Sequence, residues 1–190
     1  MSRIHFIVCG GIDSGCCYGQ IEEKHLNLSI TKYIAEYLKL YDVDVMLTRN
    51  EDVSLHRDEK YHKISDIKTR VEMTNKYTDP LFVSIHMNSF PVEKYRGFQV
   101  YYSRNNPKSE ALALQIESSV TQHINESSVR PCKGAGSDIY VLNRLHCQAV
   151  LVECGFLSNE IDRALLTDEG YRKKLAFVIA NAIANQAFAG

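Results

Sequence analysis

The sequence predicts a single α/β domain over residues 1–190, with a mostly parallel sheet of about six strands and helices on both faces. One basis is the length of 190 residues, which is typical of one domain. A second is that short apolar runs alternate with longer segments whose apolar residues recur at helical spacing. A third is that the sequence shows no repeat, low-complexity tract or linker that would divide the chain.

Four elements are expected in the first half. An apolar run predicts a buried strand over 3–9, which a glycine-rich turn then ends. Apolar residues at helical spacing predict a helix over 24–40, and a second apolar run predicts a strand over 43–48. A helix over 65–77 follows, with Ser65 as its N-cap.

The second half alternates in the same way. The expected elements are strands over 80–86 and 97–103, a helix over 107–126, strands over 138–142 and 149–153, and a helix over 167–188. The Thr167 hydroxyl is the expected cap of the last helix. In such a fold, ligands bind at the edge where the carboxyl ends of parallel strands meet.

The composition argues against several kinds of partner. With 22 basic and 23 acidic residues the net charge is −1, which gives no bulk electrostatic basis for binding nucleic acid or an anionic membrane. We expect no membrane-spanning segment, because no uncharged stretch is apolar and long enough. The apolar run near the N-terminus is too short for a signal peptide, so for an exported protein we expect the signal to be absent from this chain.

Polar side chains occur where the predicted strands end. His86 and Glu153 each close a strand, Asn88 follows His86 by two residues, and Cys9 ends the first strand. Glu23 stands at the start of the first helix. Because the carboxyl ends of parallel strands share one edge of the sheet, we expect these side chains to converge there.

Each group also has an ordinary structural interpretation. A lone histidine such as His86 can simply hydrogen-bond a loop, and the helix dipole favours a carboxylate at Glu23. A carboxylate at the end of a buried strand is unfavourable unless it is paired, binds metal or transfers protons, and Arg130 is the candidate ion-pair partner of Glu153. Taken together, the two carboxylates and the histidine fit a hydrolytic zinc site, although their spacing is not a local motif.

The sequence is similar to the zinc-dependent N-acetylmuramoyl-L-alanine amidases, in order and spacing, from about residue 4 to residue 187. The segments that carry the resemblance are EKHLNL at 23–28, LTRN at 47–50, RVEMTN at 70–75, LFVSIHMNS at 81–89, GFQVYYS at 97–103, IYVL at 139–142 and VLVECGFLSN at 150–159. The resemblance implies a mixed six-stranded sheet flanked by helices. It also implies hydrolysis of the amide between the lactyl group of N-acetylmuramic acid and L-alanine in peptidoglycan.

The resemblance also implies the roles of individual residues. One zinc ion is expected on a histidine, a glutamate and a second histidine, and Glu23 and His86 match the last two. Glu153 matches the catalytic glutamate, which takes a proton from zinc-activated water and passes it to the departing nitrogen. Arg130 resembles a basic residue often found before the IYVL segment, and Arg130 and Asn88 are the candidates for contacting the substrate or the oxyanion.

One departure from the family pattern concerns the first metal ligand. The family's first strand usually ends in a histidine followed by Gly-Gly-x-Asp-x-Gly, whereas here Cys9 precedes GGIDSG at 10–15 and the segment is about four residues short. Three explanations are open. Cys9 binds zinc as a thiolate, or the protein has lost the metal and its catalysis, or a loop with the histidine is missing from this sequence, which the sharpness of the shortening favours.

The cellular role is also suggested by resemblance. Residues 55–70 and 90–96 look most like the spore-cortex members of the family. This implies export to the cell wall or spore cortex and a part in forming muramic-δ-lactam. It also implies peptidoglycan as the substrate partner and an activating lipoprotein as a possible second partner. Two rival functions are considered. In the first, the protein is a metal-poor family member that binds peptidoglycan or needs a partner for activity. In the second, it is a zinc exopeptidase. The retained His86 and Glu153 argue against the first, and the full-length motifs argue against the second.

Overall fold

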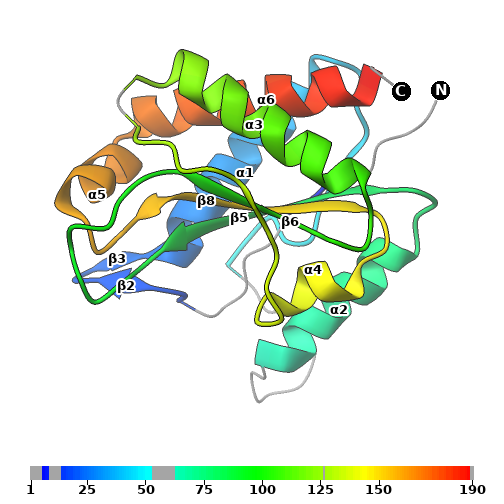
Figure 1. Ribbon diagram of the computed structural model, residues 1–190, viewed down its shortest axis with the longest axis horizontal. Helices are drawn as coiled ribbons and strands as arrows, with labels where there is room; N and C mark the ends of the chain where they lie inside the picture. The colour runs from blue at the N-terminus through cyan, green and yellow to red at the C-terminus, as the bar shows by residue number, and fades with distance from the viewer. Residues whose placement is uncertain (1–5, 9–13, 53–62, 126, 189–190) are drawn as a thin grey trace.

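The computed structural model describes residues 6–8, 14–52, 63–125 and 127–188 (Figure 1). The strands are β1 (Phe6–Val8), β2 (Cys17–Tyr18), β3 (Ile21–Glu22), β4 (Val45–Leu47), β5 (Leu81–Asn88), β6 (Gln99–Tyr102), β7 (Lys133–Gly134) and β8 (Gln148–Phe156). The helices are α1 (Glu23–Lys39), α2 (Lys63–Asn75), α3 (Lys108–His123), α4 (Tyr140–Arg144), α5 (Glu160–Thr167) and α6 (Glu169–Phe188).

The main sheet has six strands in the order β4-β1-β5-β8-β6-β7, and β2 and β3 form a separate antiparallel pair. Neighbouring strands of the main sheet are parallel, except that β6 runs antiparallel to β8. The predicted mixed, mostly parallel sheet is therefore confirmed. Because β5 and β8 are parallel neighbours, their carboxyl ends lie side by side at one edge of the sheet.

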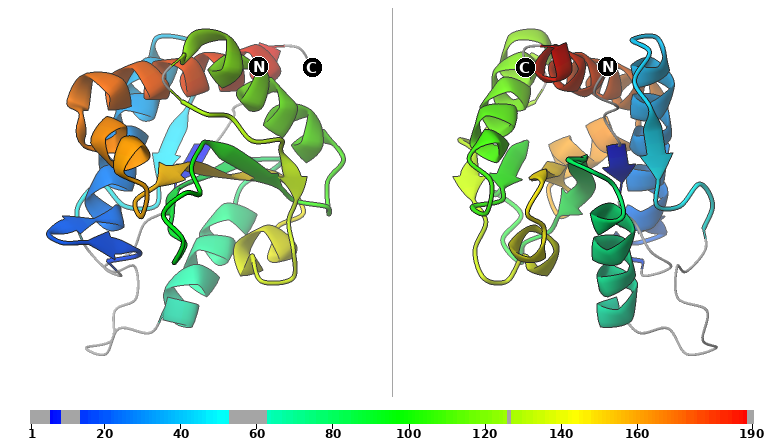
Figure 2. Two further views of the ribbon diagram at one scale, coloured as in Figure 1. Left: turned by 60° about the vertical axis from the view of Figure 1, so that its left-hand side comes forward. Right: turned by 90° about the vertical axis from the view of Figure 1, so that its right-hand side faces the viewer.

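Helices cover both faces of the sheet, as the right-hand view of Figure 2 shows. On one face α1, α3 and α6 pack over the larger core, which includes Ile85 of β5. On the other face lie α2 and α4, next to a smaller cluster that contains Phe82 of β5 and Leu151 of β8. Side chains alternate along a strand, so His86 and Glu153, which are in phase with Phe82 and Leu151, face the α2/α4 side.

Long segments with clear periodicity form the predicted elements. The helix expected over 24–40 is α1, whose buried residues recur every three or four positions and include Leu26, Ile30, Ile34 and Leu38. The helix expected over 107–126 is α3, which ends at His123. Within the described part of the chain, no helix has the length and apolar character needed to cross a membrane.

The strand expected over 138–142 is wrong, because this segment contains α4 instead. The Asn143 side-chain amide donates to the carbonyl oxygens of Gly136 and Ile139, at 2.7 and 2.9 Å, and so holds the turn closed. Val141 and Leu142 are buried against the smaller cluster. An apolar run this short fits a strand or a helical turn equally well, so periodicity could not separate the two.

Two predicted helix caps are also wrong. The segment over 167–188 does not begin with a cap at Thr167, which is instead the last residue of α5. Asp168 separates α5 from α6, and its Oδ1 accepts the N–H of Tyr171 at 2.6 Å. Ser65 lies inside α2, which begins at Lys63, and its carbonyl oxygen accepts the Thr69 hydroxyl.

Candidate active site

The candidate site lies at the carboxyl ends of β5 and β8, on the α2/α4 face of the sheet. His86 of β5 pairs in register with Glu153 of β8, and Glu153 pairs on its other side with Gln99 of β6. These three residues form one row across three neighbouring strands. Glu23, the first residue of α1, joins the row through its contact with His86, so the predicted convergence of Glu23, His86 and Glu153 is present in the structure.

Glu23 and His86 form a close pair. Glu23 Oε1 lies 2.8 Å from His86 Nδ1 and also accepts the Met87 N–H at 3.2 Å. Glu23 Oε2 accepts the Cys16 N–H at 2.9 Å. Burial acts to raise the pKa of Glu23, but the hydrogen bonds and charge of His86, together with the two backbone N–H groups, outweigh it and hold the pKa below its usual value. The pair is therefore built around a carboxylate.

A glycine makes the approach to Glu23 possible. Gly15 has a φ of +67°, which favours glycine over other residues. A Cβ at this position would overlap the Glu23 carboxylate. The turn before β2 can therefore reach the site only with glycine at position 15.

The Glu153 carboxylate is buried, and one of its oxygens, Oε2, is not hydrogen-bonded to any described residue. Burial raises the pKa of Glu153 to about 7, with the His86 charge lowering it and the Glu23 charge raising it. An unpaired buried carboxylate is unfavourable for folding, so its presence in this row points to a use in proton transfer or ligand binding.

Arg130 does not pair with Glu153, so the ion-pair interpretation of Glu153 is wrong. The Arg130 guanidinium lies over the Phe156 ring, 5.5 Å from its centroid. Phe156 pairs in register with Asn88, which places Arg130 at the same edge of the sheet as the row. The Asn88 side chain accepts the backbone N–H of Ser89 at 2.8 Å and so shapes the turn after β5.

Three residues at the site were not singled out in the sequence. The Cys16 thiol donates to the Met87 carbonyl oxygen at 3.2 Å and ties the β2 segment to the end of β5. Gln99 and Tyr101 lie on β6, on the face that carries Glu153. Their alternation on a strand was visible in the sequence, but their position beside Glu153 depends on how β6 pairs with β8.

The described residues supply part of a metal site. No group of three or more His, Cys, Asp or Glu side chains within these ranges is placed to hold a metal ion. Nevertheless, the 2.8 Å between Glu23 Oε1 and His86 Nδ1 is close to the separation of about 3.3 Å expected for two ligands of one tetrahedral zinc ion. Carboxylate and imidazole are suitable zinc ligands. Cys9, which is one of the open explanations for the missing first ligand, lies outside the described residues.

The raised pKa of Glu153 predicts how stability depends on pH in metal-free protein. The folded pKa of about 7 exceeds the ordinary value of 4.5, so the folded state binds more protons between these values. The free energy of unfolding should therefore fall as pH rises from about 4.5 to 7, by roughly 3 kcal/mol at 1.36 kcal/mol per pKa unit. Urea unfolding of chelator-treated protein at pH 5 and pH 8 measures this loss.

The Glu153→Gln variant is the comparison for that measurement. Glutamine cannot ionise, so the stability of Glu153→Gln relative to the original protein should improve between pH 5 and pH 8. Other titrating groups are shared by both proteins and cancel in the difference. A difference that does not change with pH would show that Glu153 ionises as freely as it does in the unfolded chain.

Comparison with known proteins gives consistent matches. The family model for N-acetylmuramoyl-L-alanine amidases matches residues 5–185. The germination-specific N-acetylmuramoyl-L-alanine amidase of Bacillus subtilis is 29% identical over 178 residues, which cover 92% of this chain and 74% of that relative. The endolysin of Bacillus phage SPP1 is 30% identical over 179 residues, covering 92% of this chain and 62% of the endolysin.

Solved structures agree with this assignment. The CwlD amidase from Clostridioides difficile, in complex with the GerS lipoprotein, matches with a TM-score of 0.87 and 31% identity over 100% of both chains. The amidase AmiC2 of Nostoc punctiforme matches with a TM-score of 0.83 and 28% identity over 98% of each chain. The resemblance seen in the sequence motifs thus extends to the whole fold, and the chain belongs to the N-acetylmuramoyl-L-alanine amidase family of peptidoglycan hydrolases.

Proposed function

We propose that this amidase cleaves the bond between the lactyl group of N-acetylmuramic acid and L-alanine by using one zinc ion, with Glu23 and His86 as ligands and Glu153 as the proton-transferring group. The proposal rests on the buried Glu153 Oε2, which has no hydrogen-bond partner in the described part of the chain and lies in the same row as the Glu23–His86 pair. A structural carboxylate would be expected to have a partner. A carboxylate that must accept a proton from water needs a free oxygen.

Each residue then has a distinct task. Zinc, when bound, supplies a Lewis acid that lowers the pKa of a water molecule toward neutrality. Glu153 accepts a proton from the attacking water and donates it to the L-alanine nitrogen as the C–N bond breaks. In the metal-free protein, burial raises the pKa of Glu153 to about 7, so this carboxyl group can hold a proton near neutral pH. Arg130 carries positive charge to the same edge, where it is suited to stabilise charge that develops on the carbonyl oxygen.

The function is tested by following the bond that is broken. Zinc-loaded protein is incubated with purified sacculi, and the appearance of new amino-terminal L-alanine is measured by labelling of free amines. We expect L-alanine termini to accumulate, and treatment with a chelator to stop their appearance. Binding to sacculi without any new L-alanine termini would instead support the metal-poor, peptidoglycan-binding relative.

The shortened segment favours a missing loop with the histidine, but for the chain as it stands we propose Cys9 as the third zinc ligand. A catalytic zinc site generally uses three protein ligands, and Glu23 and His86 supply two. Cys9→Ser should therefore abolish stoichiometric zinc binding, measured by metal analysis after gel filtration. Cobalt-substituted protein should show a thiolate charge-transfer band that the Cys9→Ser variant lacks.

The control for this experiment is Cys17→Ser. The Cys17 side chain is exposed, and its thiol donates to the Gly15 carbonyl oxygen at 3.8 Å. This variant should keep both the zinc ion and the charge-transfer band. Full zinc occupancy in Cys9→Ser would show that the third ligand lies elsewhere.

We also propose an exported protein that acts on spore cortex, in the step that leads to muramic-δ-lactam, with a lipoprotein as activating partner. The similarity to a germination-specific amidase supports the cortex role. The similarity to an amidase that was solved together with a lipoprotein supports the partner. Cortex from spores that lack this protein should contain less muramic-δ-lactam, as measured by muropeptide analysis.

A further inference from the structure

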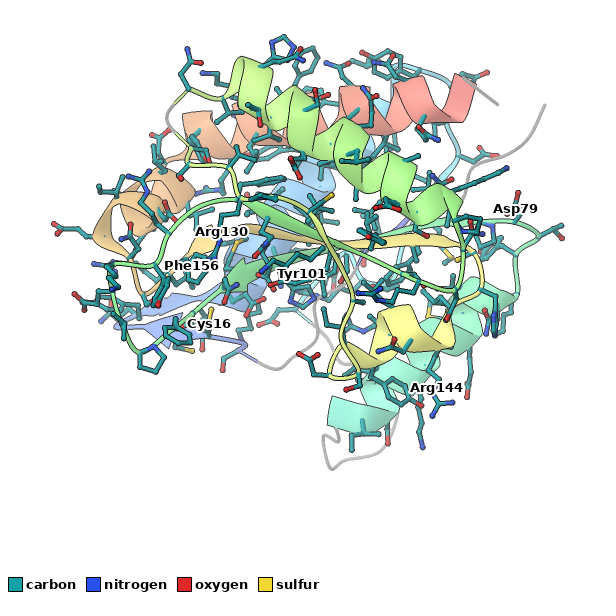
Figure 3. The ribbon with its side chains drawn as sticks, viewed as in Figure 1. Cys16, Asp79, Tyr101, Arg130, Arg144 and Phe156 are labelled. Atoms are coloured by element: carbon teal, nitrogen blue, oxygen red, sulfur yellow. The ribbon has the colours of Figure 1, made fainter. Side chains whose placement is uncertain are left out.

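Two polar residues on β6 face the candidate active site. Gln99 pairs in register with Glu153. Tyr101 pairs with Leu151, which lies two residues before Glu153 on β8. Because side chains alternate along β6, Gln99 and Tyr101 share the face that carries Glu153, while Tyr102 faces the larger core. Figure 3 labels Tyr101 over the middle of the sheet, with Arg130 and Phe156 to its left.

The orientation of Gln99 is fixed by its surroundings. Gln99 is 2% exposed, and its Nε2 donates to the Pro131 carbonyl oxygen at 2.8 Å. A carbonyl oxygen can only accept, so the amide nitrogen must face Pro131 and the amide oxygen must face the other way. The Tyr101 hydroxyl lies 3.1 Å from that oxygen and donates to it.

This arrangement determines what Tyr101 can offer to a ligand. A tyrosine hydroxyl has one hydrogen, and here Gln99 takes it. The lone pairs of the Tyr101 oxygen remain as acceptors. Tyr101 is half-buried, and burial and the Glu153 charge raise its pKa, with the Arg130 charge lowering it and the Asp138 charge raising it. The side chain is therefore a neutral phenol with fixed polarity.

We propose that Tyr101 is a substrate-contact residue that accepts a hydrogen bond from an N–H or O–H group of the muropeptide, and that Gln99 is the positioning residue that aims it. The proposal rests on the proposed function, because that function places the muropeptide beside Glu153. The donor is either an amide N–H of the stem peptide or a hydroxyl of the sugar. Both are neutral donors that an oriented phenol oxygen can accept.

The test compares two tyrosines in the zinc-loaded Glu153→Gln variant, which binds ligand without turnover. Tyr101→Phe should weaken the binding of muramyl dipeptide by about 2- to 12-fold, the range for one net hydrogen bond of roughly 0.5–1.5 kcal/mol. Binding is measured by NMR titration. Tyr102→Phe is the matched control, since the Tyr102 hydroxyl bonds Glu110 on the other face at 2.9 Å, and it should leave the Kd unchanged.

Binding of a second ligand shows which group of the muropeptide donates the hydrogen bond to Tyr101. The methylamide of N-acetylmuramic acid has the sugar, with its acetamido group, and the lactyl amide, but no peptide beyond it. Weaker binding of both ligands by Tyr101→Phe assigns the donor to the sugar or the first amide. Weaker binding of muramyl dipeptide alone assigns it to the following peptide N–H. Equal Kd values for Tyr101→Phe and its parent with both ligands overturn the proposal.

The role of Gln99 is tested through Tyr101. Gln99→Met has a similar shape and no amide, so it should weaken binding, and it should add nothing further in a protein that already carries Tyr101→Phe. Additive losses in the double variant would overturn the positioning role. If Gln99→Met proves unfolded by its melting curve, the comparison of Tyr101→Phe with Tyr102→Phe still decides the contact. A protein that releases no L-alanine termini from sacculi would refute the proposed function separately from these Kd values.

Discussion

Glu153→Gln should lower the rate of amide hydrolysis by about 10²- to 10⁴-fold, the usual contribution of a positioned acid–base group. Glutamine keeps the size and shape of the side chain but cannot accept a proton from water. Because Glu153 Oε2 has no hydrogen-bond partner among the described residues, replacing this atom by an amide nitrogen breaks no hydrogen bond to them. The fold and the zinc content should be unchanged. The rate of appearance of L-alanine termini, measured with zinc content on the same sample, gives the result.

The matched control is Glu110→Gln. Glu110 is an exposed residue in the first turn of α3, on the opposite face of the sheet, where it bonds Tyr102. This variant removes the same charge from the same kind of side chain and should retain full activity. Undiminished hydrolysis in Glu153→Gln would show that another group transfers the proton and that the buried carboxylate has a different role.

The order of elements was predictable where the pattern was long or the strand was fully buried. The apolar residues of α1 recur at helical spacing, which a strand would not show, and the first five residues of β5 are all buried. The sequence over 138–142 was ambiguous because its four apolar residues are consecutive and so show neither strand alternation nor helical spacing. The side-chain contacts of Asn143 decide in favour of a helical turn there. The break at Asp168 was missed because its capping role depends on the direction in which α6 leaves α5.

The site was predictable to the extent that it follows from parallel strands. His86 and Glu153 lie near the carboxyl ends of two neighbouring strands, so a parallel arrangement of β5 and β8 brings them to the same edge. Gln99 and Tyr101 could not be found in this way, because β6 is antiparallel to β8 and its register places Gln99 level with Glu153. The contact of Arg130 with Phe156 likewise depends on the path of the chain after α3.

His86→Ala should reduce zinc affinity by more than 100-fold and reduce hydrolysis with it. The side chain lies 2.8 Å from Glu23 Oε1, so its removal takes away a proposed ligand and a hydrogen-bond partner of the other. Loss of a residue that only supports a ligand generally lowers affinity by 10- to 100-fold, and loss of a ligand from a three-ligand site should exceed that range. Competition with a fluorescent zinc chelator measures the affinity, and metal analysis gives the stoichiometry.

The size of that effect separates two roles for His86. His123→Ala is the control, because His123 is exposed in the last turn of α3 and should change neither zinc affinity nor activity. A loss of more than 100-fold in His86→Ala identifies the imidazole as a ligand. A 10- to 100-fold loss of zinc affinity, with one zinc ion still bound per protein, would mean that His86 only orients the Glu23 carboxylate and is not itself a ligand. Unchanged affinity and stoichiometry would remove His86 from the metal site, because the 2.8 Å contact would then be only a hydrogen bond.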